Sequence, residues 1–347
     1  MILKKIPLWV KLSFIVVVIF ALVCSYVPYV LYSPSIYPIE GERTYLHIQQ
    51  DETFADVVAN LQTQANMARL PAFLKIAKVI KYDDTVRTGR YEIYAGMNYK
   101  TFVRVISTNQ QTPTRLTFNN LRTKEQLASR IATQIDADSA SIVNLLNDTV
   151  FILSKGLTPE TAIVYFIPNT YEVYWTTTPE QLFNRMEYEY RNFWTEERRE
   201  KAAAIPLTEI EVMTLASIIE EETNLSKELP IVAGLYINRL KKMMLLQADP
   251  TIKFAINDFT IRRVLNRHLE TESPYNTYKN KGLPPGPIRV PSPRSIDAVL
   301  NHTKHNYLFM CAKETLNGEH NFAVTHAEHQ RNAQKYREAL NEQKIYR

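Results

Sequence analysis

An almost uninterrupted apolar run near the start of the chain, Leu12–Tyr32, constrains what the rest can fold into. A helix of about 20 apolar residues crosses the hydrocarbon core of a bilayer, so this run predicts a single membrane anchor. Lys4, Lys5 and Lys11 precede the run, and no comparable basic cluster follows it closely. Because positively charged flanks stay in the cytoplasm, we expect everything after Tyr32 to lie on the periplasmic or extracellular side of the cytoplasmic membrane.

Other interpretations of the apolar run fit less well. A cleaved signal peptide would need a small-residue cleavage site and a shorter apolar core of about 7–15 residues, and a buried core helix would not explain the preceding lysines. Lipid attachment at Cys24 is disfavoured because Val23 precedes it and the apolar run continues past it. Cys311 belongs to the apolar segment Tyr307–Ala312, which predicts a buried strand. No disulfide between the two cysteines is expected.

Composition limits the class of protein. The chain has 347 residues, of which 45% are hydrophobic and 22% charged, which is typical of folded domains with large cores. The formal net charge of +5 is spread along the chain rather than gathered in a basic block. This pattern gives no support for nucleic acid as a partner.

Hydrophobic periodicity divides the part after the anchor into a small module and a larger domain, both α+β. The small module is expected to contain extended segments at Thr44–Ile48 and Arg87–Met97 and helices at Thr53–Gln62, Leu70–Val79 and Tyr99–Ser107, with Asp51 as a cap of the first helix. The expected boundaries are a cytoplasmic tail (1–11), the anchor (12–32), a linker (33–43), the small module (44–108), a connecting α/β segment (109–154) and the larger domain (155–347).

Three adjacent glutamates, Glu220 to Glu222, end a helical pattern that begins at Thr208, which forms a capping box with Glu211. Residues three and four apart share a helix face, which places Glu220 and Glu222 on apolar stripes and Glu221 on the solvent side. Apolar surroundings and a neighbouring carboxylate both raise a carboxyl pKa, as a general acid requires. The alternative interpretation is the charged end of a surface helix.

Polar residues and a stiff loop follow this helix. Gln247 and Asp249 flank an expected turn at Asp249–Pro250, and the segment Tyr275–Tyr278 (Y-N-T-Y) comes after them. The loop Gly282–Ile288 (G-L-P-P-G-P-I) contains two of the chain's 8 glycines, and its prolines stiffen the backbone. The loop predicts one wall of a groove, and a rigid connector without a ligand is the alternative.

Taken together, the motifs resemble the YceG-like family of endolytic murein transglycosylases. The resemblance covers residues 155–335 most strongly and rests on F-I-P-N-T-Y-E (166–172), A-S-I-I-E-E-E-T (216–223), Y-I-N-R-L (236–240), L-Q-A-D-P-T (246–251), Y-N-T-Y, G-L-P-P-G-P-I and H-N-F-A-V-T-H-A-E-H (320–329). The small module is similar in layout to the LysM-like subdomain of that family. The chain departs from the commonest family pattern at Asn169, Ala248, Arg289–Pro293 and Gln330.

The resemblance implies cleavage of the β-1,4 bond between N-acetylmuramic acid and N-acetylglucosamine in peptidoglycan without water, which leaves a 1,6-anhydromuramic end. It places the catalytic acid and base on Glu220. The residues expected to orient this acid or bind the sugar are Glu222, Gln247, Asp249, Asn276, Tyr278 and His320. Asn238 and Arg239 are expected to support the fold. The expected partners are glycan strands, the membrane and penicillin-binding protein synthases, with no cofactor and no metal.

Three alternatives remain in view. A hydrolytic muramidase-type glycosidase would pair Glu220 with Asp249 or Glu222 as a second carboxylate. A non-catalytic, membrane-anchored scaffold would bind peptidoglycan without cutting it. A metal site built from His320, His326 and His329 is disfavoured because their spacing matches no strong zinc pattern.

Overall fold

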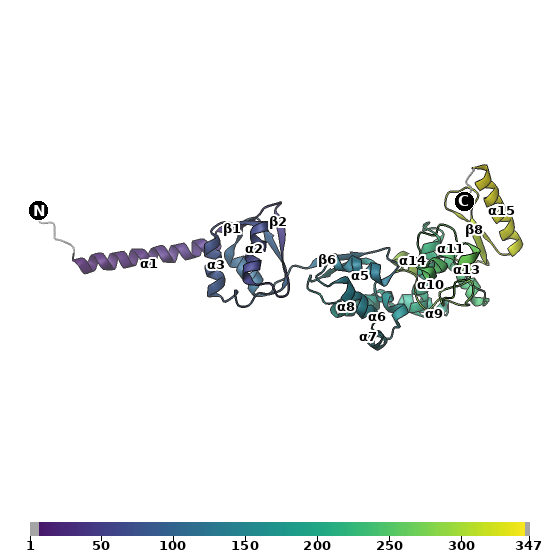
Figure 1. The fold of residues 1–347 in the computed structure, drawn as a ribbon, viewed down its shortest axis with the longest axis horizontal. Helices are drawn as coiled ribbons and strands as arrows, with labels where there is room; N and C mark the ends of the chain where they lie inside the picture. Colours follow the sequence, from purple (N-terminus) through teal and green to yellow (C-terminus); the bar gives the residue numbers. More distant parts are fainter. Residues whose placement is uncertain (1–6, 344–347) are drawn as a thin grey trace. The chain divides into compact units, whose positions relative to one another are not determined.

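The computed structural model describes residues 7–343, which form two compact units. The smaller unit extends up to Arg115 and includes Glu172–Thr177, whereas the larger unit comprises Leu116–Tyr171 and the chain from Thr178 onward. Both units contain helices and strands (Figure 1), so the predicted mixed class of fold is confirmed. Where the direction of strand pairing is defined, it is antiparallel.

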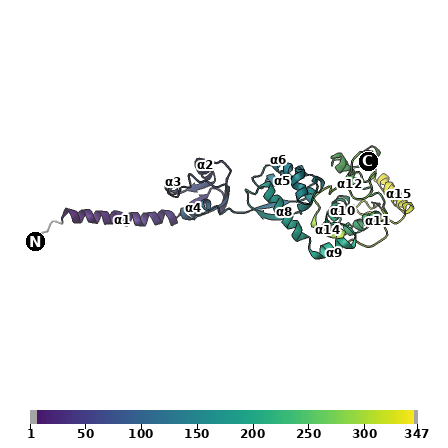
Figure 2. The ribbon, with the colours of Figure 1, turned by 90° about the horizontal axis from the view of Figure 1, so that it is seen from below.

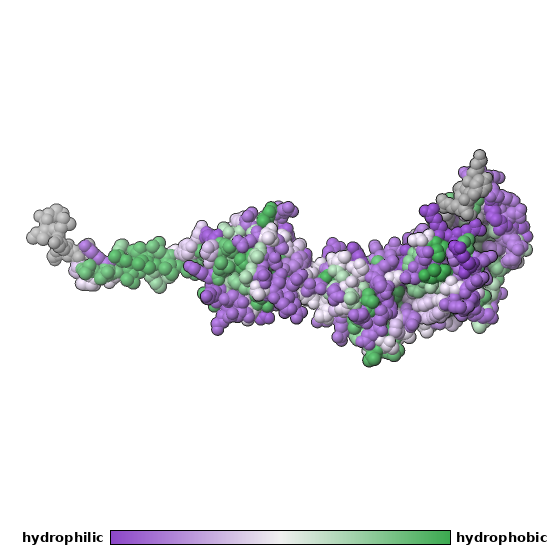
Figure 3. Space-filling view, viewed as in Figure 1, coloured by the Kyte–Doolittle hydropathy of each residue, from purple (hydrophilic) through white to green (hydrophobic). Residues whose placement is uncertain are grey.

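The first element is a long apolar helix, α1 (Leu8–Tyr32), which has 25 residues. The mean hydropathy of its most apolar stretch is 2.6, and the helix is long and apolar enough to cross a membrane. Its surface is almost continuously hydrophobic in Figure 3. The helix begins at Leu8, four residues before the apolar run. Lys4 and Lys5, on which the expected orientation depends, lie outside the described residues.

The remaining elements of the smaller unit form two small sheets with helices packed around them. They are β1 (Pro34–Pro38), β2 (Arg43–Ile48), α2 (Phe54–Gln64), β3 (Ala65–Met67), α3 (Leu70–Val79), β4 (Gly89–Tyr94), β5 (Met97–Asn98) and α4 (Tyr99–Ser107). One sheet has the order β3-β1-β5, and the other pairs β2 with β4. The segment expected to be a linker is therefore structured, because its residues 34–38 are the central strand β1, in which Ser35 and Ile36 are fully buried.

Local capping signals explain where the helices of this unit start. Thr53, not Asp51, caps α2: the Thr53 hydroxyl accepts a bond from the Asp56 amide, and the Asp56 carboxylate accepts one from the Thr53 amide. Asp51 lies two residues too early and has a left-handed backbone, with φ of 73°. Helices α3 and α4 have the bounds that the hydrophobic pattern predicts.

The larger unit is mainly helical. Its elements are β6 (Thr114–Phe118), α5 (Lys124–Ala132), α6 (Ser139–Asn147), α7 (Thr149–Ser154), the 3-10 helix η1 (Pro159–Tyr165), β7 (Asn169–Val173), α8 (Pro179–Phe193), α9 (Glu196–Ala204), α10 (Glu209–Glu222), α11 (Leu229–Lys241), α12 (Asp249–Ile256), α13 (Asn266–Leu269), α14 (Pro293–Leu300), β8 (Phe309–Ala312), β9 (His320–Ala323) and α15 (His326–Glu342). Strands β6 and β7 pair and carry the chain between the two units. Residues 116–154, expected as a connecting segment, belong to this unit.

Helix α10 lies at the centre of the larger unit and packs against α11, α12 and α14 (Figure 2). It starts with the predicted capping box, in which the Glu211 amide donates to the Thr208 hydroxyl and the Thr208 amide donates to the Glu211 carboxylate. Every residue from Val212 to Ile219 is buried. The helix therefore has no solvent-facing side along this stretch. The surroundings of the glutamates at its end depend on the elements that pack against it.

The Gly- and Pro-rich loop docks on α10 and η1. At Gly286 a β-carbon would lie 2.3 Å from the Glu160 carbonyl oxygen, so only glycine allows this approach. Gly282 has a φ of +84°, which glycine adopts without strain. The Ile288 amide donates to the Ser217 hydroxyl of α10 at 3.0 Å. Both glycines of this loop are thus required by the backbone.

Candidate active site

A cavity of about 290 Å³ in the larger unit collects most of the predicted site residues. Five of the seven line it: Glu222, Gln247, Asp249, Tyr278 and His320. These side chains come from the end of α10, the start of α12, the Y-N-T-Y segment and β9. Among the residues that the structure describes, Glu220 and Asn276 are not part of the cavity wall.

Glu222 has the properties of a general acid. It is the last residue of α10, and its Oε1 accepts a hydrogen bond of 2.7 Å from the Tyr236 hydroxyl. The pKa of Glu222 is raised to about 7, mainly by burial; the bond from Tyr236 opposes this shift, and the nearby Asp249 carboxylate adds to it. Within the described part of the chain, the second oxygen, Oε2, has no hydrogen-bond partner. A carboxyl with this pKa holds its proton in half of the molecules at neutral pH.

Asp249 and Tyr278 form a second hydrogen-bonded pair on the cavity wall. The Tyr278 hydroxyl donates to Asp249 Oδ1 at 2.5 Å. Burial, followed by this bond to a carboxylate, raises the pKa of Tyr278, so the hydroxyl remains a proton donor. Asp249 is not in a turn as expected but is the first residue of α12, with Pro250 at the second helical position, where its missing amide proton costs nothing.

Gln247 is held in a strained conformation next to this pair. Its φ is 49°, in the left-handed region that side chains other than glycine rarely adopt. The Gln247 amide donates to the Thr277 carbonyl at 3.1 Å, and the next amide, of Ala248, donates to the Thr277 hydroxyl at 3.0 Å. Backbone strain of this kind is concentrated at functional sites, where surrounding structure fixes it.

Asn276 supports the site from behind. Its side chain is fully buried, and its amide donates to the Leu269 and Thr271 carbonyls at 2.9 and 2.8 Å. Its Oδ1 accepts from the Tyr278 amide at 2.9 Å. The bonds of Asn276 therefore fix the loop that presents Tyr278 to the cavity.

Two polar cavity residues of α11 were not predicted as site residues, although both lie in the Y-I-N-R-L motif. Tyr236 and Arg239 are three residues apart, so they share a helix face. The Arg239 guanidinium donates to the Leu308 and Leu246 carbonyls at 2.6 and 2.7 Å and so joins β8 to the start of α12. The neighbouring Asn238 amide donates to the His305 carbonyl at 2.7 Å, in keeping with the expected supporting role.

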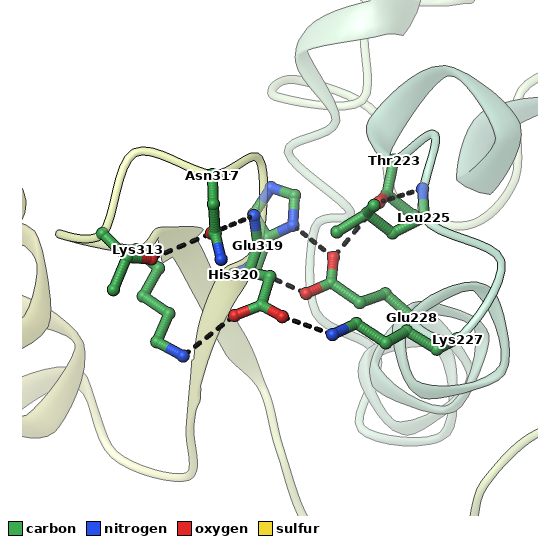
Figure 4. A network of polar contacts seen from close by, with 9 residues as sticks. Thr223, Leu225, Lys227, Glu228, Lys313, Asn317, Glu319 and His320 are labelled. Carbon is green, nitrogen blue, oxygen red and sulfur yellow. Dashed lines mark hydrogen bonds and ion pairs between the residues drawn. The ribbon is translucent and has the colours of Figure 1, made fainter.

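His320 is oriented by a buried glutamate that the sequence analysis missed (Figure 4). The two oxygens of Glu228, a side chain only 4% exposed, accept bonds of 2.8 Å from the His320 amide and from its Nδ1. Thr223, just after Glu222, donates from its hydroxyl to the same carboxylate at 3.1 Å. Because the carboxylate accepts from Nδ1, the proton of a neutral imidazole stays there and Nε2 is left as an acceptor. Glu228 carries no periodicity signal because it precedes α11.

Glu220 and Glu221 belong to a different cluster, built around two arginines. Arg289, 6% exposed, donates from Nη1 to Glu221 at 2.7 Å and lies 3.5 Å from Glu220. Arg122 forms a bidentate pair with Glu221 at 2.9 and 3.0 Å. Glu220 also accepts from the Ser292 amide at 2.7 Å. The prediction that Glu221 faces solvent is wrong, because its side chain is only 16% exposed and these arginines, from segments distant in sequence, cover it.

Strand β8 contributes Met310, Cys311 and Ala312 to the cavity wall. The predicted strand within Tyr307–Ala312 is confirmed as β8, but the prediction that it is buried is wrong, because all four residues of β8 are only half-buried. The strand pairs only with β9 among the elements that the structure describes, and one of its faces borders the cavity. This exposure follows from its place at the cavity wall.

Comparison with known proteins agrees with this geometry. A sequence model of the YceG-like family matches residues 46–335. The chain belongs to the YceG-like family. The match begins in β2 and ends in α15, so it includes every residue of the cavity wall. The resemblance predicted from the motifs is confirmed.

Individual YceG-like relatives cover the chain to different extents. An endolytic murein transglycosylase of Bacillus subtilis is 27% identical over 328 residues, which are 86% of this chain and 90% of that protein. An endolytic murein transglycosylase of Streptococcus pneumoniae is 30% identical over 176 residues, which are 48% of this chain and 31% of that protein. The crystal structure of a putative YceG-like protein of Listeria monocytogenes superposes with a TM-score of 0.56 at 27% identity, covering 84% of this chain and 98% of that one.

The histidines of the YceG-like C-terminal motif have separate surroundings. His320 is bound to Glu228, whereas the rings of His326 and His329 lie 5.8 and 5.6 Å from the ring of Phe309. Over residues 7–343, no group of three or more histidine, cysteine, aspartate or glutamate side chains is arranged to hold a metal ion. The aromatic contacts of His326 and His329 help to dock α15 on β8.

Proposed function

We propose that this chain is an endolytic murein transglycosylase that cleaves the β-1,4 bond between N-acetylmuramic acid and N-acetylglucosamine and leaves a 1,6-anhydromuramic end. The relatives that match most of the chain or about half of it bear the name endolytic murein transglycosylase. The observation that carries the proposal is the Glu222 carboxyl, with a pKa of about 7, in a cavity lined by hydrogen-bonding side chains.

Glu222 takes the catalytic role that we had expected for Glu220. Glu222 lines the cavity and has a free oxygen there, whereas both oxygens of Glu220 are engaged by the Ser292 amide and the Arg289 guanidinium. Both glutamates belong to the same family motif and point from adjacent parts of one helix end. The location of the cavity supports Glu222 over Glu220 as the proposed acid.

The proposed reaction uses one carboxyl twice. Protonated Glu222 donates its proton to the glycosidic oxygen as the bond to the muramic C1 breaks. The resulting carboxylate then accepts the proton of the muramic C6 hydroxyl as that oxygen bonds to C1, which closes the anhydro ring and restores the acid. The nucleophile belongs to the substrate, so no second carboxylate is needed as in an ordinary glycosidase.

The other residues of the cavity wall orient the acid and bind the sugars. Tyr236 fixes one oxygen of Glu222 by its hydrogen bond, and the Asp249–Tyr278 pair, in which the Tyr278 hydroxyl donates to Asp249, offers acceptor oxygens at the start of α12. Gln247 contributes an amide. His320, whose Nδ1 is held by Glu228, accepts a hydrogen bond from a sugar hydroxyl at Nε2. A small number of placed hydrogen-bonding groups of this kind suits the hydroxyl and amide groups of a glycan.

The first helix supports a location of this site at a membrane. Helix α1 is proposed to cross the cytoplasmic membrane, with the catalytic unit on the periplasmic or extracellular side, next to peptidoglycan and penicillin-binding protein synthases. The order β2-α2-β3-α3-β4, with β2 antiparallel to β4, supports a LysM-like assignment for residues 44–108. The larger domain, which we placed at 155–347, holds all cavity residues.

Product analysis tests the proposed reaction. Purified glycan strands are digested with the full chain in detergent, and the released fragments are weighed by mass spectrometry. The expected fragments are lighter by one water than hydrolysis products, because the muramic end is a 1,6-anhydro ring. Hydrated ends would support the muramidase alternative, and the absence of fragments would support the scaffold.

The pH dependence of the reaction provides a second test, because two neighbours move the Glu222 pKa in opposite directions. In the wild type kcat/KM is expected to fall above pH about 7, where Glu222 loses its proton. Tyr236→Phe removes a bond that favours the carboxylate, so the fall should move to higher pH. Asp249→Asn removes a negative charge that favours the protonated form, so the fall should move to lower pH. Initial rates on fluorescent glycan strands between pH 5 and 9 measure both shifts.

Tyr188→Phe is the matched control for the loss of a hydroxyl, because Tyr188 on α8 is 59% exposed and outside the cavity. Its pH profile should overlay that of the wild type. If Tyr236→Phe and Asp249→Asn shift the profile in the same direction, or neither shifts it, Glu222 is not the group that limits the rate at high pH.

A further inference from the structure

We infer that α3, with the three residues that follow it, lies on the membrane surface and binds acidic lipid headgroups, so that the smaller unit is held against the bilayer in one orientation. The inference rests on the proposed membrane insertion of α1. It concerns a surface of the smaller unit, whereas the cavity belongs to the larger unit, and it is argued from the smaller unit alone.

The end of α1 is fixed to the folded part of the smaller unit. Val30, only 6% exposed, is part of the unit's hydrophobic core. The Arg69 guanidinium donates to the Ser33 hydroxyl at 2.6 Å and lies 4.8 Å from the centre of the Tyr29 ring. On the other helix, α4, the Lys100 ammonium donates to the Tyr32 hydroxyl at 2.6 Å. Anchoring the helix therefore also orients the unit.

Helix α3 lies at the end of the unit from which α1 leaves. It begins directly after Arg69, the residue that contacts α1. Figures 1 and 2 both show α3 running across the direction of α1, with the strands of the unit on its far side. A bilayer that surrounds α1 would therefore face the outer side of α3.

That outer side combines apolar and basic side chains. Phe73 and Ala77 face the core and are fully buried, whereas the side chains that remain exposed are apolar or basic. The exposed apolar residues are Leu74 at 37%, Val79 at 82% and Ile80 at 43%, and the exposed basic residues are Lys75, Lys78 and Lys81. From residue 69 to residue 82 the chain has four cations and no acidic residue, although two aspartates follow at 83 and 84.

Acidic lipid explains this surface better than a protein partner does. Apolar side chains interleaved with lysines are typical of helices that lie in the membrane interface, where the apolar groups enter the acyl boundary and the ammonium groups reach anionic headgroups. The surface is continuous with the end of α1, so lipid is already next to it once α1 is inserted. Helix α3 can then bind lipid without a separate encounter between the protein and a membrane.

Fluorescence in nanodiscs tests the inference with the full chain. The chain, carrying Cys24→Ser and Cys311→Ser, receives the label NBD on Val79→Cys and is reconstituted at one copy per disc with phosphatidylcholine alone or mixed with phosphatidylglycerol. With phosphatidylglycerol we expect a blue shift of NBD emission and quenching by doxyl-labelled lipid. Val150→Cys is the matched control, since Val150 on α7 of the larger unit is 81% exposed and lies on no basic face. NBD at this position should emit as a water-exposed label, with no blue shift and no quenching by doxyl-labelled lipid.

A charge variant then tests the headgroup contribution. Replacing Lys75, Lys78 and Lys81 by glutamine should abolish the blue shift and quenching, whereas replacing the exposed lysines 241, 242 and 335 of the larger unit should leave both unchanged. Equal emission at the two labelled positions would overturn the inference, as would a signal indifferent to phosphatidylglycerol or to the α3 lysines. Failure of α1 to insert would appear separately, because the chain would not copurify with the discs.

Discussion

Replacement of Glu222 by glutamine is expected to reduce turnover of glycan strands by about 10²–10⁴-fold, the range that a positioned general acid contributes. Glutamine keeps the shape of the side chain and can still bond to Tyr236, whose hydroxyl donates to Glu222 Oε1 in the wild type. It has no proton of suitable acidity for the glycosidic oxygen and cannot accept one from the C6 hydroxyl. The measurement is the rate of release of anhydromuramic fragments under single-turnover conditions.

Glu220→Gln is the matched control, because it is the same chemical change on the same helix end, two residues earlier. Glu220 bonds to the Ser292 amide and lies beside Arg289, outside the cavity wall. Its replacement should leave turnover within about tenfold of the wild type. The opposite ranking, with Glu220→Gln inactive and Glu222→Gln active, would return the acid to the residue that the motif alone suggested.

The sequence sufficed wherever structure follows from neighbours along the chain. The capping box at Thr208 fixed the start of α10, and the apolar spacing of α3 and α4 gave their bounds. The sequence motifs predicted five residues that line the cavity, because each motif lies within one loop or at one helix end. These features depend on local geometry, which the sequence displays directly.

The surroundings of the three glutamates could not be predicted without the tertiary structure. A prediction from helical periodicity assumes one apolar face and one solvent-facing side, but α10 is buried on all sides from Val212 to Ile219. Arg122, between β6 and α5, and Arg289, before α14, cover Glu221. Which stripe borders a cavity depends on how α11 and α12 pack against α10. The importance of Glu228 was hidden for the same reason, since its partner His320 lies 92 residues away in sequence.

Arg289→Met is expected to destabilise the larger unit by about 3 kcal/mol, the lower end of the cost of removing one partner from a buried ion pair. The Arg289 guanidinium is 6% exposed and contacts Glu221, Asn120 and Glu220. Methionine fills similar volume but leaves the two carboxylates with Arg122 as their remaining cation. For a unit of this size the melting temperature should fall by roughly 6–12 °C, measured by thermal unfolding of the full chain in detergent.

Two further variants separate charge from packing. Arg294→Met removes an exposed arginine whose main contact is the Ser226 hydroxyl, at 2.8 Å, and should change the free energy of unfolding by no more than about 0.5 kcal/mol. Adding Glu220→Gln to Arg289→Met removes the carboxylate that Arg122 does not pair with and should recover part of the lost stability, since residues in one ion-pair network are not additive. If the double variant is as unstable as the sum of the single ones, the cluster stabilises α10 by packing rather than by charge. In that case the segment Arg289–Pro293 would hold α10 through the apolar part of the Arg289 side chain. Packing, and not charge, would then fix the position of Glu222.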